Sequence, residues 1–355
     1  MKKKFLALVL TMAMACALAA CGGSPKEETA PANQETKESE EEKAPQEEEK
    51  APSEEGADLS NLVIGYSEYA TYNDWRVAHA NNIQDAIKEA GWTCIFDDAQ
   101  DDQENQIKAL RNFISQDVDV IVISPATATG WDTVLQEVYD AGIPVIVTDR
   151  TINVSNEDFV DSYILPQAHE EAANELCTWL GEYMTSLERG EDELNVAILQ
   201  GTIGGDSEIA RTNAIHNWCD ANPNYKIVLE QTGNYTRAEG QEVMESFLKS
   251  GTKIDILYSE NDDMSLGAIE AIKAAGLKPG EDIVIISFDG TKAGFEAMVE
   301  GHINCIKECT PFVDDHLADT ITAIMNGEEV EKVIYMSDGL FPQETAAENV
   351  DSRVY

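Results

Sequence analysis

The chain has few basic residues and only one long apolar run. Among its 355 residues, Lys and Arg number 24 against 67 Asp and Glu, and the formal net charge is −43. A surface this acidic repels nucleic acid, so DNA-binding and RNA-binding functions are excluded. After residue 20, no segment is apolar for long enough to cross a membrane as a helix.

Motifs for covalent or metal chemistry are also scarce. The Gly-rich stretch 201–205 lacks the Lys-Ser/Thr of a P-loop, and no acidic segment has the spacing of a calcium loop. The five histidines form no recognisable catalytic motif, and we expect His79 to lie on a helix surface. The sequence therefore predicts no enzyme activity, no cofactor and no metal.

Cysteines are too few to form the framework of the fold. Five follow residue 21, an odd number without metal-ligand spacing, and we expect most to be small core residues. They are Cys94, Cys177, Cys219, Cys305 and Cys309. Whether Cys305 and Cys309 pair stays open.

The first residues look like a targeting signal. Lys2, Lys3 and Lys4 precede an apolar stretch at 5–20, and the segment 18–21 reads Leu-Ala-Ala-Cys. Small residues before a cysteine resemble the lipobox of bacterial lipoproteins. That resemblance implies a signal peptide at 1–20, cleavage before Cys21, and lipidation of Cys21 that anchors the chain without a spanning helix. The alternative is an ordinary signal peptide that contains a cysteine.

Residues 24–58 have the composition of a tether. Thirteen acidic residues and four lysines lie among Ala, Pro, Ser, Gln and Thr, without any aromatic residue. Such a segment cannot bury enough apolar surface to offset its ordering entropy. We therefore expect 21–58 to be a lipidated cysteine followed by a disordered acidic tether. The signal has a net charge of +3 and the tether a net charge of −9, so the remaining part of the chain carries −37 of the total net charge of −43.

From residue 62 onward, strand-like and helix-like segments alternate. The first set predicts strands at 62–66, 93–96, 118–124 and 143–148, with helices at 77–90, 103–116 and 130–141. The run 118–124 is almost wholly apolar, which is typical of a strand buried on both faces of a parallel sheet. This order predicts a doubly wound α/β sheet.

The pattern then restarts. Strands are predicted at 194–200, 225–231, 254–259, 283–288 and 303–307, and helices at 208–222, 237–249, 264–275 and 292–300. The two sets predict two similar Rossmann-like lobes.

Polar and aromatic residues follow the predicted strands directly. They lie at 72–76, 124–125, 149–150, 234–237, 260–263 and 289–290. Ligands of such sheets bind beyond the carboxyl ends of the strands. Carboxylates and amides pair with vicinal hydroxyls, Arg offers a planar set of donors, and aromatic rings stack on sugar C–H faces. This set favours a polyhydroxylated ligand.

At these residues the chain resembles the periplasmic sugar-binding proteins of ABC importers, of the ribose/galactose-binding type, and most closely their galactofuranose-binding branch. The resemblance covers 61–355. Its strongest stretches are 103–109 (QENQIKA), 128–131 (ATGW), 143–150 (IPVIVTDR), 242–247 (EVMESF), 261–264 (NDDM), 276–280 (GLKPG) and 288–290 (FDG).

The resemblance implies a type I periplasmic-binding-protein fold. Two Rossmann-like lobes are joined by a three-segment hinge and close on a ligand in the cleft between them. The N-terminal lobe would comprise 59–164 with about 309–337, and the C-terminal lobe 165–308 with about 338–355.

The resemblance also implies ligand contacts. In the first lobe they are Asn73, Trp75, Arg76, Asp149 and Arg150; in the second they are Arg211, Tyr235, Asn261, Asp289 and Glu308, with Arg237 a weaker candidate. Trp75-Arg76 stands where ribose-type members have two adjacent aromatics, as in the galactofuranose-like branch. Asp74 departs from the Gly of that branch, so the identity of the sugar stays open.

Local rules give competing interpretations of several of these residues. Trp75 could pack at a helix start, Asp149-Arg150 could be a surface ion pair, and Asp262 or Asp263 could cap a helix while Asn261 contacts ligand. Trp131, Trp179 and Trp218 lie in helical segments and are expected to be packing residues.

The sequence as a whole predicts a monomeric, extracytoplasmic, lipid-anchored solute-binding protein. It would bind a monosaccharide, galactofuranose-like or a related furanose or pentose, by lobe closure and deliver it to an ABC importer permease. The alternative is a sugar or small-molecule sensor that serves a chemoreceptor or signalling protein. A sugar-responsive transcription regulator is disfavoured by the signal, the tether and the lack of a basic helix-turn-helix.

Overall fold

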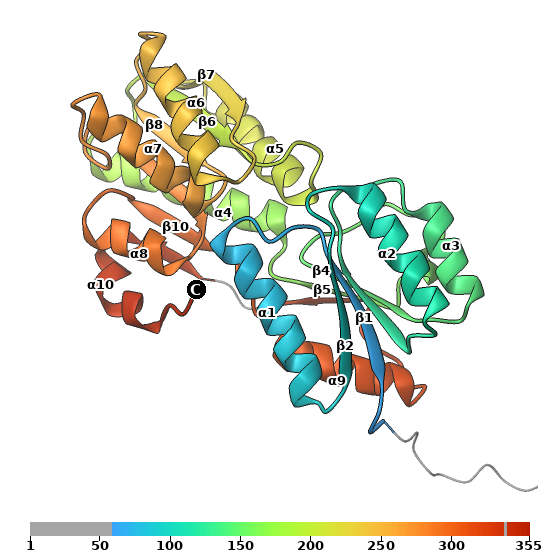
Figure 1. The fold of residues 1–355 in the computed structure, drawn as a ribbon. Helices are drawn as coiled ribbons and strands as arrows, with labels where there is room; N and C mark the ends of the chain where they lie inside the picture. The colour runs from blue at the N-terminus through green and yellow to red at the C-terminus, as the bar shows by residue number, and fades with distance from the viewer. Residues whose placement is uncertain (1–58, 337–338) are drawn as a thin grey trace, which may run out of the picture. The chain divides into compact units, whose positions relative to one another are not determined.

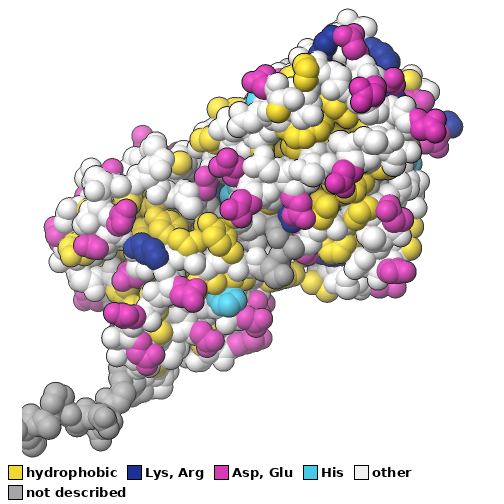
Figure 2. All heavy atoms as spheres, turned by 180° about the vertical axis from the view of Figure 1, so that it is seen from behind, with side chains coloured by type: hydrophobic (Ala, Val, Ile, Leu, Met, Phe, Trp, Pro, Cys, Tyr) yellow, Lys and Arg dark blue, Asp and Glu magenta, His cyan; other side chains and the backbone are white. Residues whose placement is uncertain are grey.

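The computed structural model describes residues 59–336 and 339–355. The predicted signal peptide, Cys21 and the acidic tether lie outside the described residues. Within the described part, no helix has both the length and the apolar character needed to cross a bilayer. Figure 2 shows Asp and Glu side chains scattered over the visible face with few Lys and Arg, as the charge balance predicts.

The first sheet has six parallel strands in the order β11-β5-β4-β3-β1-β2. Its strands β1, β2, β4 and β5 are labelled in Figure 1. Their bounds are β1 Val63–Glu68, β2 Thr93–Asp98, β3 Val120–Ser124, β4 Val145–Thr148, β5 Ser162–Leu165 and β11 Val333–Tyr335. Helices cover both faces, because successive apolar residues of the central strands point to opposite sides.

One face of this sheet packs against α1 (Asp74–Glu89) and α9 (Asp314–Met325). There Val120 and Val122 meet Ile83 of α1 and Leu317 of α9. The other face packs against α2 (Gln103–Ser115) and α3 (Asp132–Asp140), and it includes the alternate residues of the same strands. Each fully buried aliphatic side chain contributes about 1.5–3 kcal/mol.

The second sheet repeats the plan in the order β12-β10-β9-β8-β6-β7. Its strands are β6 Leu194–Gln200, β7 Tyr225–Thr232, β8 Ile256–Ser259, β9 Val284–Asp289, β10 Cys305–Glu308 and β12 Leu340–Pro342. All pair in parallel except β12, which is antiparallel to β10.

Helices also cover both faces of the second sheet. On one side lie α4 (His169–Ser186) and α5 (Asp206–Ala221). On the other lie α6 (Arg237–Lys249), α7 (Asp262–Ala274) and α8 (Lys292–Val299), with α10 (Ala346–Asn349) beside α8. Short 3-10 turns are η1 Glu157–Phe159, η2 Gln343–Thr345 and η3 Val350–Ser352.

The chain passes between the two sheets three times. The first crossing follows β5, the second follows β10, and the third joins β11 to β12. Each sheet with its helices forms one lobe, so the predicted fold class of two Rossmann-like lobes is confirmed.

The structure corrects some local expectations. His79 was expected on a helix surface, but it is fully buried, and its Nδ1 lies 2.8 Å from a carboxylate oxygen of Glu68. Asn261, rather than Asp262 or Asp263, caps α7, because its side chain accepts a hydrogen bond from the N–H of Met264. Cys305 and Cys309 are both free thiols, and only Cys94 of the five cysteines in the described part is half-buried rather than buried.

Candidate functional site

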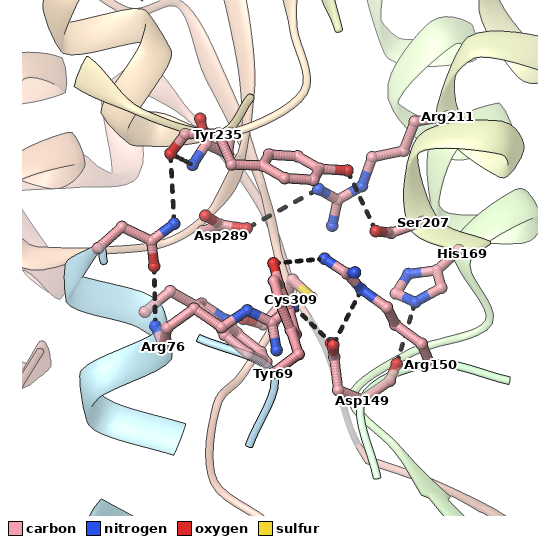
Figure 3. A pocket seen from close by; sticks show the side chains of 13 residues that line it. Tyr69, Arg76, Asp149, Arg150, His169, Ser207, Arg211, Tyr235, Asp289 and Cys309 are labelled. Atoms are coloured by element: carbon pink, nitrogen blue, oxygen red, sulfur yellow. Dashed lines mark hydrogen bonds and ion pairs between the residues drawn. The ribbon is translucent and has the colours of Figure 1, made fainter. Parts of the chain in front are cut away.

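The two lobes share a pocket at the carboxyl ends of their strands. It is a narrow pocket, with about 320 Å³ of space not occupied by atoms when the solvent at its open mouth is included. Figure 3 shows side chains from opposite sides pointing toward one another across it. The lining residues are Tyr69, Asn73, Trp75, Arg76, Asp149, Arg150, His169, Ser207, Arg211, Tyr235, Asn261, Asp289 and Cys309.

The first lobe contributes a buried carboxylate between two arginines. Oδ2 of Asp149 lies 2.6 Å from Nη2 of Arg76 and 3.1 Å from Nε of Arg150. Burial opposes ionisation, but the charges of Arg76 and Arg150 outweigh it and lower the pKa of Asp149 to about 2. Since all three side chains are almost completely buried, the interpretation of Asp149-Arg150 as a surface ion pair is wrong.

The ring of Tyr69 contacts both arginines. The guanidinium carbons of Arg76 and Arg150 lie 4.3 and 4.4 Å from the centre of its ring. Arg150 also donates to the Tyr69 hydroxyl at 2.8 Å. Cation–π contacts of this kind fix the planes of both guanidinium groups.

The second lobe contributes a looser pair, Arg211 and Asp289. Their closest atoms are 3.9 Å apart, and Nη1 of Arg211 donates to the carbonyl oxygen of Glu260 at 2.5 Å. Burial raises the pKa of Asp289 well above its usual range, because Arg211 offsets it only in part. Burial and the nearby arginines thus lower the pKa of Asp149 and raise that of Asp289. Three arginines and two aspartates line the pocket.

Two asparagines place Tyr235 over the pocket. Asn73 and Asn261 each donate from Nδ2 to the carbonyl oxygen of Tyr235 at 3.2 Å. Each also caps its own helix, Asn73 by accepting from the N–H of Arg76 and Asn261 by accepting from that of Met264. Asn73 lies in the first lobe and Tyr235 in the second, so this contact joins the lobes.

Gly201, directly after β6, makes room for the Tyr235 ring. A Cβ at this position would lie 1.9 Å from Cζ of Tyr235, far inside contact distance. The stretch 201–205 therefore accommodates an aromatic ring.

His169 connects the start of α4 to the first lobe. Its Nε2 donates to the carbonyl oxygen of Asp149 at 3.2 Å, and its Nδ1 accepts from Gln167 at 3.3 Å. This pattern is that of a neutral imidazole. Burial, together with the charge of Arg211, lowers the pKa of His169 to about 4.

The pocket includes all the predicted contacts except Glu308. Trp75 donates from its indole N–H to the carbonyl oxygen of Cys309 at 2.5 Å and stacks on His79. Glu308 lies outside the lining set, and its carboxylate is occupied by Arg353 and by the N–H of Gly339. Arg237 is half exposed and pairs with Asp263, also away from the pocket.

Sequence reasoning missed four lining residues. Tyr69 and Cys309 each directly follow a strand of the structure. The strand-end rule missed Tyr69 because the predicted first strand stopped before Glu68. It missed Cys309 because that residue was expected in the core. His169 and Ser207 stand at helix starts, for which the strand-end rule gives no signal. The described residues contain no cluster of His, Cys, Asp and Glu that could hold a metal ion.

Comparison with known proteins identifies the family. The periplasmic binding protein domain family matches residues 64–327, most of the chain. The chain belongs to this family. Over 296 residues it is 37% identical to the galactofuranose-binding protein YtfQ of Escherichia coli K12, and the aligned region covers 82% of this chain and 91% of YtfQ. The members it resembles are solute-binding proteins and not enzymes.

Two solved structures are similar to this chain, with TM-scores of 0.78 and 0.77. The first, from Mycobacterium smegmatis, is a complex with β-D-fucofuranose; it is 40% identical, covering 82% of this chain and 94% of that one. The second is the binding component of the arabinose ABC transporter of Shewanella sp. ANA-3, bound to α- and β-L-arabinofuranose; it is 39% identical, covering 82% and 95%.

Proposed function

We propose that this periplasmic binding protein captures one monosaccharide in the furanose ring form and delivers it to an ABC importer. The observation that carries the proposal is the convergence of three buried arginines, two buried aspartates and aromatic rings from both lobes on one small pocket. A sugar offers many hydroxyl oxygens in a small volume, and these donors and acceptors match them.

The residues take distinct parts in this proposal. Arg76, Arg150 and Arg211 donate to sugar oxygens, whereas Asp149, Asp289 and Asn261 set the geometry of hydroxyl groups. Trp75 and Tyr235, from opposite lobes, enclose the ring. Asn73 contributes by holding Tyr235 and closing the lobes on the ligand.

The furanose form is supported by the relatives. The YtfQ protein is named for galactofuranose, and the two solved structures hold fucofuranose and arabinofuranose. The conserved plan of the fold does not by itself select a sugar. Which of these sugars is bound depends on residues at the pocket wall, such as Tyr69 and Ser207.

A titration tests the binding claim. The purified chain is titrated calorimetrically with galactose, arabinose, fucose, ribose and glucose. We expect saturable one-to-one binding of at least one of the first three, weakened by about 2 kcal/mol, or roughly thirtyfold, in Arg150→Ala. The matched control is Arg111→Ala, which removes an exposed arginine paired with Glu137. Absence of binding to every sugar would contradict the proposal.

We also propose that the chain is exported, lipidated at Cys21, monomeric, and recognised by a permease in its ligand-bound form. The sequence at 18–21 and the acidic segment 24–58 support the anchor. Cys21→Ala is expected to release the chain from cell membranes and to abolish labelling by an alkyne-tagged fatty acid. Unchanged membrane association in that variant would refute lipidation at Cys21.

A further inference from the structure

Asp289, the last residue of β9, has an unusual backbone conformation beside the pocket. Its φ is +106°, in a region that side-chain-bearing residues rarely adopt, and Gly290 after it has a φ of +90°. Such a conformation persists only where its surroundings hold it. Whatever fixes this backbone also fixes the direction in which the Asp289 carboxyl group enters the pocket.

Several contacts hold this turn. The carboxylate of Asp262 accepts hydrogen bonds from the N–H groups of Gly290 and Thr291 at 3.0 and 2.8 Å. The carbonyl oxygen of Asp289 accepts from the N–H of Cys309 at 3.0 Å and from the hydroxyl of Tyr355 at 2.8 Å. Asp262 stands next to the lining residue Asn261, and Cys309 itself lines the pocket, whereas Tyr355 comes from a segment far along the chain.

Tyr355 is itself held on two sides. Its ring packs edge-on against Phe312 of the second crossing, with centres 5.4 Å apart and planes at 85°. Its backbone oxygen accepts from the N–H of Lys292 at 2.6 Å, at the start of α8. The Tyr355 hydroxyl is thus directed at the Asp289 carbonyl oxygen.

Arg353 ties the same segment to the crossings between the lobes. Its guanidinium carbon lies 4.2 and 4.5 Å from the ring centres of Phe295 and Phe341, and it forms an ion pair with Glu308. The other oxygen of Glu308 accepts from the N–H of Gly339 at 2.9 Å. Glu308 is the last residue of β10, directly before the second crossing, and Gly339 directly precedes β12, where the third crossing ends.

We propose that the 353–355 segment positions the ligand site from behind. Tyr355 fixes the direction of Asp289, and the Glu308–Arg353 pair fixes Tyr355 against the crossings. Glu308 is then a positioning residue that acts through Arg353 and not a ligand contact. The inference rests on the proposed function in using sugar affinity as one of its measurements.

The first test removes only the hydroxyl group. Tyr355→Phe is expected to weaken sugar binding about fivefold, since one hydrogen bond to the Asp289 backbone is lost. The matched control, Tyr335→Phe, alters an exposed tyrosine on β11 and leaves affinity unchanged. Glu308→Gln, which keeps an acceptor for Gly339 but removes the charge facing Arg353, weakens binding in the same direction.

A double-mutant cycle separates positioning from general support of the fold. In an Asp289→Ala background, Tyr355→Phe is expected to change affinity less than twofold, because the group it positions is gone. An equal loss in both backgrounds, or no loss in the unaltered background, would overturn the inference. Melting temperatures of all variants show whether each chain is folded.

A measurement without ligand keeps the two proposals distinct. Hydrogen exchange at the Cys309 N–H, the other donor to the Asp289 carbonyl oxygen, is expected to quicken in Tyr355→Phe and not in Tyr335→Phe. Equal exchange in both variants overturns the inference even if sugar binds. If no sugar binds while exchange quickens, the proposed function fails and the positioning role stands.

Discussion

Replacing Asp149 by Asn tests whether the arginine cluster of the first lobe depends on one carboxylate. In the native chain this group lies 2.6 Å from Arg76 and 3.1 Å from Arg150, with only 4% of its side chain exposed. Asp149→Asn leaves two buried guanidinium groups without that negative charge between them. Breaking a buried ion pair in this way costs about 3–5 kcal/mol.

The same cluster predicts how this cost depends on pH. The pKa of Asp149 falls from an ordinary 3.8 to about 2, so the folded state favours the ionised form. The difference corresponds to roughly 2 kcal/mol of stability, present above pH 4 and lost as the pH falls toward 2. The loss of unfolding free energy caused by Asp149→Asn should therefore become smaller by about the same amount as the pH falls from 4 toward 2.

Urea unfolding followed by circular dichroism at pH 7, 4 and 2.5 measures both quantities. Asp319→Asn, which alters an exposed aspartate on α9, is the matched control and should change the free energy of unfolding by less than about 0.5 kcal/mol. A cost for Asp149→Asn below about 1 kcal/mol at pH 7, or a cost independent of pH, would refute this account of the cluster.

Two further predictions concern the second lobe. Gly201→Ala should displace the Tyr235 ring, because the new Cβ would lie 1.9 Å from it. We expect the free energy of unfolding to fall by about 1–3 kcal/mol and sugar binding to weaken. Unchanged values of both quantities would contradict the packing described. Burial raises the pKa of Glu260 to about 8, so ionisation destabilises the folded chain as the pH rises from about 4.5 through 8. Glu260→Gln should therefore be more stable than the native chain at pH 9 and not at pH 5, as thermal melts at both values would show; a gain equal at both would mean that charge is not the cause.

Much of the fold could be predicted because its central strands are buried on both faces. Runs such as Val120–Ser124 and Val284–Asp289 are mostly apolar and are buried at every position, as expected of central strands in a parallel sheet. The helix at 237–249 was predicted with its observed bounds, and in the structure the side chain of Thr236 caps its start.

Other elements escaped prediction for local reasons. The sequence placed Trp179 in a helical segment, but the bounds of that helix, α4, were not predicted. Its buried residues lie at helical spacing, whereas Ala168 before it provides no capping side chain. Strands β5, β11 and β12 have only three or four residues each. They are stabilised by pairing with distant strands, which a local pattern does not reveal.

The site could be predicted where it follows strands directly. Asp149 and Asp289 both end up in the pocket for that reason, and their backbones both have positive φ. The opposite directions of their pKa shifts could not be predicted, since these depend on arginines that approach to 2.6 Å in one case and 3.9 Å in the other. The contact of Glu308 with Arg353 likewise depends on a segment 45 residues away.

The central claim, a furanose held between the lobes, is tested most directly by the ring form of the bound sugar. Galactose, arabinose and fucose labelled with carbon-13 at the anomeric position are each mixed with the chain, and carbon spectra distinguish five-membered from six-membered rings. We predict that the bound signal of at least one sugar is that of the furanose, although this form is the minor one in free solution. A bound signal from the pyranose alone, or no bound signal from any of the three, would contradict the account.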